Sequence, residues 1–105
     1  MDNRLEAPIS KEIQSYLKDI GVFHYRSQVY CGKTKTGAFL QTGVKGLADI
    51  TCILPNKLLF IETKKADGKQ TIHQKAFMYR VRQLGHDYII ARSVDDVKEY
   101  LTDFK

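Results

Sequence analysis

The sequence predicts an α/β domain in which a central mixed sheet is flanked by helices. Segments with helical and strand patterns follow one another in the order α-β-β-β-α-β-α, which is the natural order for such packing. The two strands in the middle of the chain are apolar on both faces, as expected of a sheet that is covered on two sides. With 105 residues, of which 43% are hydrophobic, the chain suits one compact domain spanning 1–105.

The chain opens with a predicted helix that ends at Gly21. Apolar residues recur there every three or four positions and form one helical face: Ile9, Ile13, Leu17 and Ile20. Pro8 suits the first turn of this helix, because its missing N–H costs nothing there. Residues 22–30 follow with loose alternation and many β-branched and aromatic side chains, so they predict a strand.

The middle of the chain combines a glycine-rich stretch with a hairpin. Residues 31–46 contain four glycines, three lysines and no acidic residue. They predict a flexible, positively charged loop, either alone or with a short strand around Ala38–Gln41. Two apolar runs then fold about Pro55–Asn56 and predict an antiparallel strand pair.

The C-terminal part predicts a helix, a strand and a second helix. The first helix spans 70–84 and is closed by Gly85, with an inner stripe formed by Phe77, Val81 and Leu84. Residues 87–91 form a short buried strand. Ser93 can cap the last helix. Three apolar residues of that helix face inward: Val94, Val97 and Leu101.

Charged residues at the far ends of the hairpin raise a question of function. In an even-numbered hairpin centred on Pro55–Asn56, residues whose numbers sum to 111 lie opposite one another. Asp49 and Glu62 then have Cβ atoms roughly 4.5–5.5 Å apart, and Lys64 shares their face. Opposed carboxylates repel unless a divalent cation such as Mg²⁺ lies between them. The alternative is a set of solvated strand ends, with Lys64 and Glu62 in an ordinary surface ion pair.

The charge balance indicates an anionic partner. The formal net charge is +5, and nucleic acid is the commonest polyanion that such a protein binds. The candidate phosphate-binding residues are Arg26, Lys33, Lys35, Lys45, Lys65 and Lys69. A single lysine of this kind is more often a solvated surface cation, but as a set these residues fit a basic rim around the site. Tyr25 could stack on a base, but we expect it to be buried in the sheet. The three histidines lack ligand spacing, so we expect structural roles for His24, His73 and His86.

Two further features bear on the compartment. Cys31 and Cys52 are 21 positions apart and form no CxxC motif, so reduced thiols and a cytoplasmic location are expected. In a viral protein this location would be the host-cell cytoplasm. No run of about 18 apolar residues occurs, so no membrane span is expected.

One ordered series of motifs resembles a known family. Gly46-Leu47-Ala48-Asp49, then Glu62-Thr63-Lys64, then Gln74 resemble the GxPD…ExK…Q series of VRR-NUC (virus-type replication-repair nuclease) domains in the PD-(D/E)xK nuclease superfamily. The resemblance runs through nearly the whole chain and is closest to the small stand-alone members. Ala48 departs from the family pattern, which has a proline there. That proline stiffens the backbone and is not a ligand, so no chemistry is lost.

The resemblance implies a fold and an activity. The fold would be restriction-endonuclease-like, and the activity would be Mg²⁺- or Mn²⁺-dependent hydrolysis of DNA phosphodiesters, usually on branched DNA. Stand-alone relatives look like homodimers that place two sites across a symmetric junction, so four-way (Holliday) junction cleavage is the preferred expectation. Two rival functions stay open: a non-catalytic nucleic-acid-binding module, and an interaction protein whose positive charge is incidental.

The resemblance also implies catalytic roles for four matching positions. Asp49 and Glu62 look like metal ligands, joined by the backbone carbonyl of Thr63. Lys64 looks like the residue that orients the attacking water and offsets charge on the phosphate. Gln74 would support this lysine or the phosphate.

A fifth position in the family series belongs to the first helix. The family has a glutamate there that reaches the metal, often through water. Glu6 matches it by its spacing to the apolar positions and to Gly21, and Glu12 is the competitor.

Overall fold

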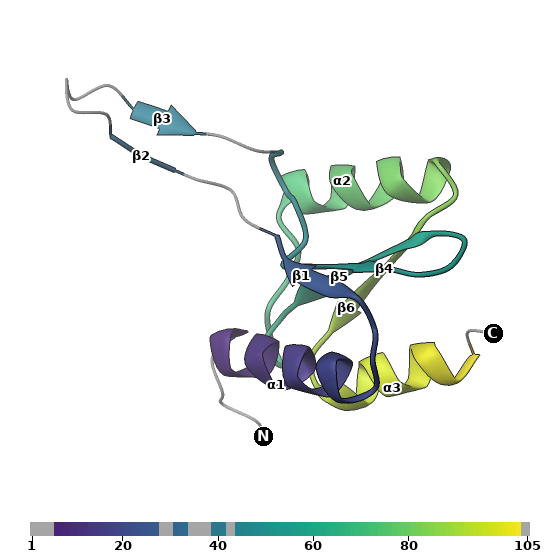
Figure 1. Cartoon of the computed structure of the whole chain (residues 1–105). Helices are drawn as coiled ribbons and strands as arrows, with labels where there is room; N and C mark the ends of the chain where they lie inside the picture. Colours follow the sequence, from purple (N-terminus) through teal and green to yellow (C-terminus); the bar gives the residue numbers. More distant parts are fainter. Residues whose placement is uncertain (1–5, 28–30, 34–38, 42–43, 104–105) are drawn as a thin grey trace.

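The computed structural model is a mixed β-sheet layered between helices, with a separate two-stranded ribbon (Figure 1). It describes residues 6–27, 31–33, 39–41 and 44–103. In chain order the elements are α1 (Glu6–Asp19), β1 (His24–Arg26), β2 (Cys31–Lys33), β3 (Phe39–Gln41), β4 (Ile50–Ile53), β5 (Leu58–Thr63), α2 (Ile72–Gln83), β6 (Asp87–Ala91) and α3 (Val94–Asp103).

The main sheet has the strand order β1-β4-β5-β6. β4 is antiparallel to both β1 and β5, whereas β6 runs parallel to β5. The sheet is therefore mixed, as the sequence predicts. β2 and β3 pair only with each other in the described part of the chain and extend away from the body of the domain (Figure 1).

Helices cover the sheet on both faces. α1 and α3 lie side by side on one face (Figure 1), where they enclose a core built of Ile9, Ile13, Leu17, Ile50, Cys52, Leu54, Leu59, Ile61, Ala91 and Val97. α2 lies on the other face, over a smaller cluster formed by Ala48, Phe60, Met78, Val81 and Tyr88. The ring of Phe77 meets that of Phe60 edge-on at 5.1 Å, which fixes α2 on β5.

The hairpin register is the one that the sequence predicts. Ile50 pairs with Ile61, and Ile53 pairs with Leu58, so each pair of numbers sums to 111. The turn is closed by a hydrogen bond from the Leu54 N–H to the Lys57 carbonyl of 2.9 Å. This register places Asp49 opposite Glu62 at the far end of the hairpin.

Several elements differ from the prediction in extent. β1 is shorter than the predicted strand 22–30, of which residues 28–30 lie outside the described part. The predicted short strand around Ala38–Gln41 is present as β3 (Phe39–Gln41), and Ala38 lies outside the described residues. The sequence did not predict β2. Leu84 is 67% exposed rather than inward-facing, because it is the C-cap residue of α2.

Tyr25 is half-exposed on the edge strand β1, so its predicted burial is wrong; α2 covers β5 and β6 and leaves this strand open. The last helix agrees better with the prediction, since Val97 is buried and Val94 and Leu101 pack beside it. Among the described residues, no helix combines the length and the apolar character that crossing a membrane requires.

Candidate functional site

The predicted site residues gather at one end of the main sheet. Asp49 immediately precedes β4, and Glu62 and Thr63 are the last two residues of β5. Glu6 is the first residue of α1, and Gln74 is the third residue of α2. The start of one strand and the end of its antiparallel neighbour therefore meet the N-terminal ends of two helices.

Asp49 is held by both neighbouring strands. Its Oδ2 atom accepts hydrogen bonds from the Thr63 N–H at 2.9 Å and from the Thr63 hydroxyl at 2.5 Å. On the other side, the Ser27 N–H donates to the Asp49 carbonyl at 2.7 Å. The carboxylate consequently has a fixed position at the strand end, and the Thr63 side chain has a positioning role that the sequence did not predict.

Glu62 is a buried carboxylate with one unsatisfied oxygen. The residue is 2% exposed, and its Oε2 accepts a hydrogen bond from the Gln74 side-chain amide at 3.2 Å. The Lys64 Nζ lies 3.7 Å from the same oxygen. Oε1 is buried without a hydrogen-bond partner. Since a buried polar atom without a partner is costly, this oxygen is a ligand-seeking group.

The electrostatics around Glu62 agree with this interpretation. The pKa of Glu62 is raised to about 8, first by burial and then by the nearby Asp49 charge, against the lowering effect of Lys64. The charge of Asp49 acts on Glu62 across the strand pair, so the two carboxyl groups lie close together. A divalent cation between them would offset both the repulsion and the loss of hydration.

The donor set fits a hard divalent cation such as Mg²⁺ or Mn²⁺. Two carboxyl groups meet at the sheet end, one of them with a buried oxygen that lacks a partner. In the described part of the chain, however, no three His, Cys, Asp or Glu side chains are gathered closely enough to hold a metal ion. The fit therefore rests on Asp49 and Glu62, with backbone oxygen and water completing a shell, as is usual for Mg²⁺.

Lys64 is buried rather than solvated. Its side chain is 8% exposed and that of Glu62 is 3% exposed, so the alternative of an ordinary surface ion pair is wrong. The Lys64 N–H donates to the Ala91 carbonyl at 3.0 Å and continues the β5–β6 ladder. A Cβ atom at Gly68 would lie 3.4 Å from the Lys64 side chain, so the turn after β5 closes against its stem.

Arg92 holds this turn in place. Its Nη1 donates to the carbonyls of Lys65 at 2.6 Å and Gly68 at 2.8 Å. The backbone N–H of Arg92 donates in turn to the Asp96 carboxylate at 2.8 Å. Sequence reasoning missed Arg92, because no local pattern reveals a side chain that binds backbone carbonyls 24 to 27 positions away.

Gln74 joins α2 to Glu62. The Thr71 N–H donates to the Gln74 Oε1 at 2.8 Å, and the Gln74 N–H donates back to the Thr71 hydroxyl at 3.1 Å, which forms a capping box. The other end of the same amide donates to Glu62. Support for Lys64 or for phosphate stays a prediction; the contact seen in the structure is with the glutamate.

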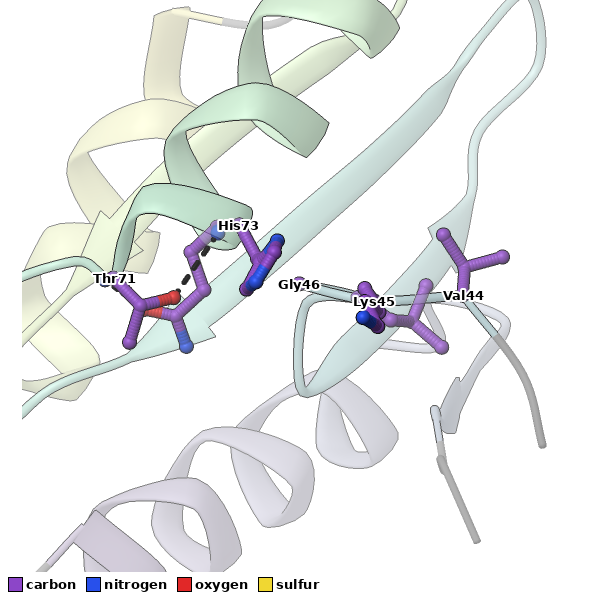
Figure 2. A pocket seen from close by; sticks show the side chains of 7 residues that line it. Val44, Lys45, Gly46, Thr71 and His73 are labelled. Atoms are coloured by element: carbon purple, nitrogen blue, oxygen red, sulfur yellow. Dashed lines mark hydrogen bonds between the residues drawn. The ribbon is translucent and has the colours of Figure 1, made fainter. Parts of the chain in front are cut away.

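Gly46 permits a close approach between the loop and α2. Its φ is +76°, and a Cβ atom there would lie 2.1 Å from the His73 carbonyl oxygen, so a larger residue would collide with backbone. An adjoining cavity of about 440 Å³ is lined by Val44, Lys45, Gly46, Leu47, Thr71, His73 and Gln74. Figure 2 shows Lys45 and His73 at this cavity, on the two segments that Gly46 brings together.

A smaller cavity lies on the α1 side of the site. Its lining is Glu6, Ala7, Ser10, Arg26, Asp49 and Thr63. Glu6 thus shares a cavity with the Asp49–Thr63 pair, whereas Glu12 is exposed and does not line it. This arrangement favours Glu6 over Glu12 as the first-helix glutamate.

The candidate phosphate-binding cations are distributed around this end. Arg26 lines the small cavity and Lys45 the larger one, and both side chains are exposed. Lys65 and Lys69 are exposed on the turn after β5, with Lys65 near Asp67 at 3.9 Å. Lys33 lies in β2 without a described side chain, and Lys35 lies outside the described residues.

Two of the three histidines contact backbone groups, and the third lies at the larger cavity. The His24 Nδ1 lies 2.8 Å from the Val22 carbonyl, and the His86 Nδ1 accepts a hydrogen bond from the Leu58 N–H at 3.0 Å. Both therefore have structural contacts, as expected. His73 lies at the larger cavity and is exposed.

Comparisons with known proteins establish the fold. No protein-family model matches the sequence, and no curated protein matches it. A solved structure titled "VRR_NUC domain" superposes with a TM-score of 0.68 at 20% sequence identity, over 95% of this chain and 97% of that chain. The chain therefore has the fold of a VRR_NUC domain, which confirms the fold class predicted from its sequence.

Proposed function

We propose that this chain is a metal-dependent nuclease that hydrolyses DNA phosphodiester bonds. The observation that carries the proposal is the buried Oε1 of Glu62, which has no hydrogen-bond partner. The Asp49 carboxyl group and the Lys64 ammonium lie close to this side chain. Paired carboxylates next to a fixed cation are arranged for metal-assisted attack on a phosphate. The VRR_NUC fold supports the same interpretation.

In this proposal, Asp49 and Glu62 would hold Mg²⁺ or Mn²⁺ with the Thr63 carbonyl, and Glu6 would reach it from α1 through a water. Such an ion would supply Lewis-acid chemistry at a phosphate oxygen and a water of lowered pKa. The chain itself fixes the ligands. Thr63 positions Asp49 through two hydrogen bonds, and Gln74 positions Glu62 through one.

Lys64 supplies positive charge where negative charge develops on the phosphate. Its ammonium is buried and already placed 3.7 Å from the Glu62 carboxylate. A preorganised charge in a water-poor site stabilises a transition state more strongly than the same charge in bulk water. The lysine would therefore orient the water and offset charge without a conformational change.

The proposed substrate is branched DNA, with a four-way junction as the preferred form and a homodimer as the acting species. Arg26, Lys45, Lys65 and Lys69 surround the site and supply sequence-independent phosphate contacts. A domain of 105 residues has little surface with which to hold a branched substrate, and a two-fold pair would match a symmetric junction. The buried free thiol of Cys52 is in keeping with action in the cytoplasm.

The test is a panel of end-labelled four-way junctions, forks, flaps and linear duplexes incubated with Mg²⁺, Mn²⁺ or a chelator. Wild-type protein is expected to nick branched substrates only with the metal. Asp49→Asn and Glu62→Gln are expected to bind the same DNA without cutting it. Glu99→Gln, on an exposed part of α3 away from the site, is the control that should retain activity.

A non-catalytic DNA-binding module is the second candidate. It is favoured by the absence of a gathered three-ligand metal set among the described side chains. Binding of DNA without any metal-dependent nicking by wild-type protein would select this candidate. A DNA affinity that does not fall with added salt would exclude both, since phosphate contacts release counterions.

A further inference from the structure

The sheet carries an exposed apolar patch outside the candidate site. Along β1, even-numbered residues face α1, as Arg26 does in the small cavity, so Phe23 and Tyr25 project from the opposite face. Ile53 lies across from Phe23, to which it is joined by a 2.9 Å backbone hydrogen bond. We refer to Phe23, Tyr25 and Ile53 as the aromatic face.

The aromatic face is uncovered because α2 does not reach it. α2 packs against β6 and against Phe60 of β5, whereas β1 forms the edge of the sheet (Figure 1). Phe23 is 69% exposed, Tyr25 is 52% exposed and Ile53 is 47% exposed. Three apolar side chains at adjoining positions with this exposure form a patch of the kind that often binds a partner, whereas single exposed apolar residues are normal.

The position of this face indicates which partner. It lies on the side of the sheet that carries Glu62, and Tyr25 pairs with Thr51, two residues from Asp49. The next residue after Tyr25 is Arg26, which lines the cavity that contains Asp49. A strand whose phosphate lies at the carboxylates would therefore pass its neighbouring nucleotides over Tyr25.

The charge around the aromatic face suits a nucleic acid. Neither 22–27 nor 50–54 contains an aspartate or glutamate, and the whole chain has a net charge of +5. Base–aromatic stacking tolerates any sequence, because every base has a π-face. An exposed aromatic strand face beside basic residues is the arrangement that single-strand binding requires.

The spacing of the two rings selects unpaired nucleotides. Alternate residues of a strand lie about 6.6 Å apart, given a rise of about 3.3 Å per residue. Consecutive bases of a duplex strand are only about 3.4 Å apart. Two bases that each stack on one ring must therefore be splayed, as in a single strand or at a branch point.

We propose that Phe23 and Tyr25 form a stacking platform for unpaired bases of the DNA strand that enters the candidate site. This inference rests on the proposed nuclease function and adds to it the part of the substrate that is recognised. The platform explains why a small domain would prefer branched DNA to an intact duplex. Arg26 at the small cavity and Lys45 at the larger one would hold phosphates near the carboxyl groups, and the aromatic face would hold bases.

The first experiment measures DNA affinity by fluorescence anisotropy in a chelator, so that no cleavage occurs. Phe23→Ala and Tyr25→Ala should each weaken binding to a single-stranded oligonucleotide about 5- to 150-fold, because stacking contributes about 1–3 kcal/mol per base. Duplex affinity should stay within about twofold. Tyr25→Phe should retain binding, and Tyr79→Ala is the matched control, because Tyr79 is 62% exposed on α2.

The second experiment uses the unaltered protein. An oligonucleotide that carries 5-iododeoxyuridine is irradiated in the complex, and the crosslinked peptide is identified by mass spectrometry. A crosslink at Phe23 or Tyr25 supports the platform, because this chemistry favours an aromatic ring that is stacked on the iodinated base. Crosslinks confined to the lysines of the turn after β5 would overturn it.

Other outcomes separate this inference from the proposed function. If both alanine variants bind single strands as tightly as wild type while Mg²⁺-dependent nicking persists, the platform is wrong and the nuclease stands. If wild-type protein binds no DNA, both fail. If Tyr25→Ala converts a dimer into a monomer on gel filtration without changing single-strand affinity, the aromatic face is a contact between two copies of the chain.

Discussion

Replacement of Glu62 by glutamine should make the metal-free protein more stable, with an effect that grows with pH. The folded state keeps the Glu62 proton up to about pH 8, whereas an ordinary glutamate loses it near 4.5. Between these values the unfolded state binds fewer protons than the folded state, so stability falls as pH rises. Below about pH 4.5 this loss is absent, and above about pH 8 it is complete.

The size of the effect follows from the pKa difference. At 1.36 kcal/mol per pH unit, a pKa raised from 4.5 to about 8 lowers the free energy of unfolding by about 5 kcal/mol once the loss is complete. At neutral pH the loss in the free energy of unfolding is about 3 kcal/mol. Glutamine keeps the shape and removes the charge. For a domain of this size, about 3 kcal/mol corresponds to a rise in Tm on the order of 10–20 °C.

The assay is thermal unfolding followed by circular dichroism in a chelator, at several pH values between about 5 and 8. The gap in Tm between Glu62→Gln and wild type should widen with pH and should narrow when Mg²⁺ is added, because only wild type offers the second carboxylate. Glu99→Gln, on an exposed part of α3, provides the control. A difference in Tm between Glu62→Gln and wild type that stays constant with pH would show that burial does not raise the pKa of Glu62.

Three other substitutions and one chemical modification have distinct expected outcomes. Lys64→Met should lower the cleavage rate about 10²- to 10³-fold with DNA affinity nearly unchanged, as measured by single-turnover kinetics and anisotropy. Arg92→Met should loosen the turn over the Lys64 stem, so that mass spectrometry detects faster acylation of Lys64. Gly46→Ala should cost more than about 2 kcal/mol of unfolding free energy in urea, because its methyl group meets the His73 carbonyl. The Cys52 thiol, whose pKa burial raises to about 12, should react with a thiol reagent only after unfolding.

Each of these expectations has a contrary result. Equal loss of binding and cleavage in Lys64→Met would show a role in affinity rather than in the reaction. Unchanged acylation of Lys64 in Arg92→Met would remove the positioning role of the arginine. Wild-type stability of Gly46→Ala, or rapid modification of Cys52 in native protein, would contradict the packing described for these residues.

The sequence predicted the parts of the site that depend on local pattern. Asp49 and Glu62 could be paired because hairpin alternation and an even turn fix the register, and both operate within a few residues of Pro55–Asn56. The side of α2 that faces Glu62 is not fixed locally, so its contact with Gln74 required the packed structure. For the same reason, the role of Arg92 could not be foreseen.

The open edge of the sheet shows the same limit. Tyr25 has the composition of a buried strand residue, and only the reach of α2 decides that it is half-exposed. Leu84 continues the apolar spacing of α2, but the helix ends there and the side chain faces solvent. Periodicity therefore predicts which face a residue occupies, while tertiary packing decides whether anything covers that face.

The single amide of Gln74 has a wider consequence. One of its atoms caps the first turn of α2 and another donates to the buried Glu62 side chain, so the start of the helix and the position of that side chain are linked. Asparagine is one methylene shorter and cannot span both partners at once. Because Thr71, His73 and Gln74 also line the larger cavity, the same amide connects the wall of that cavity to the buried carboxyl group of Glu62.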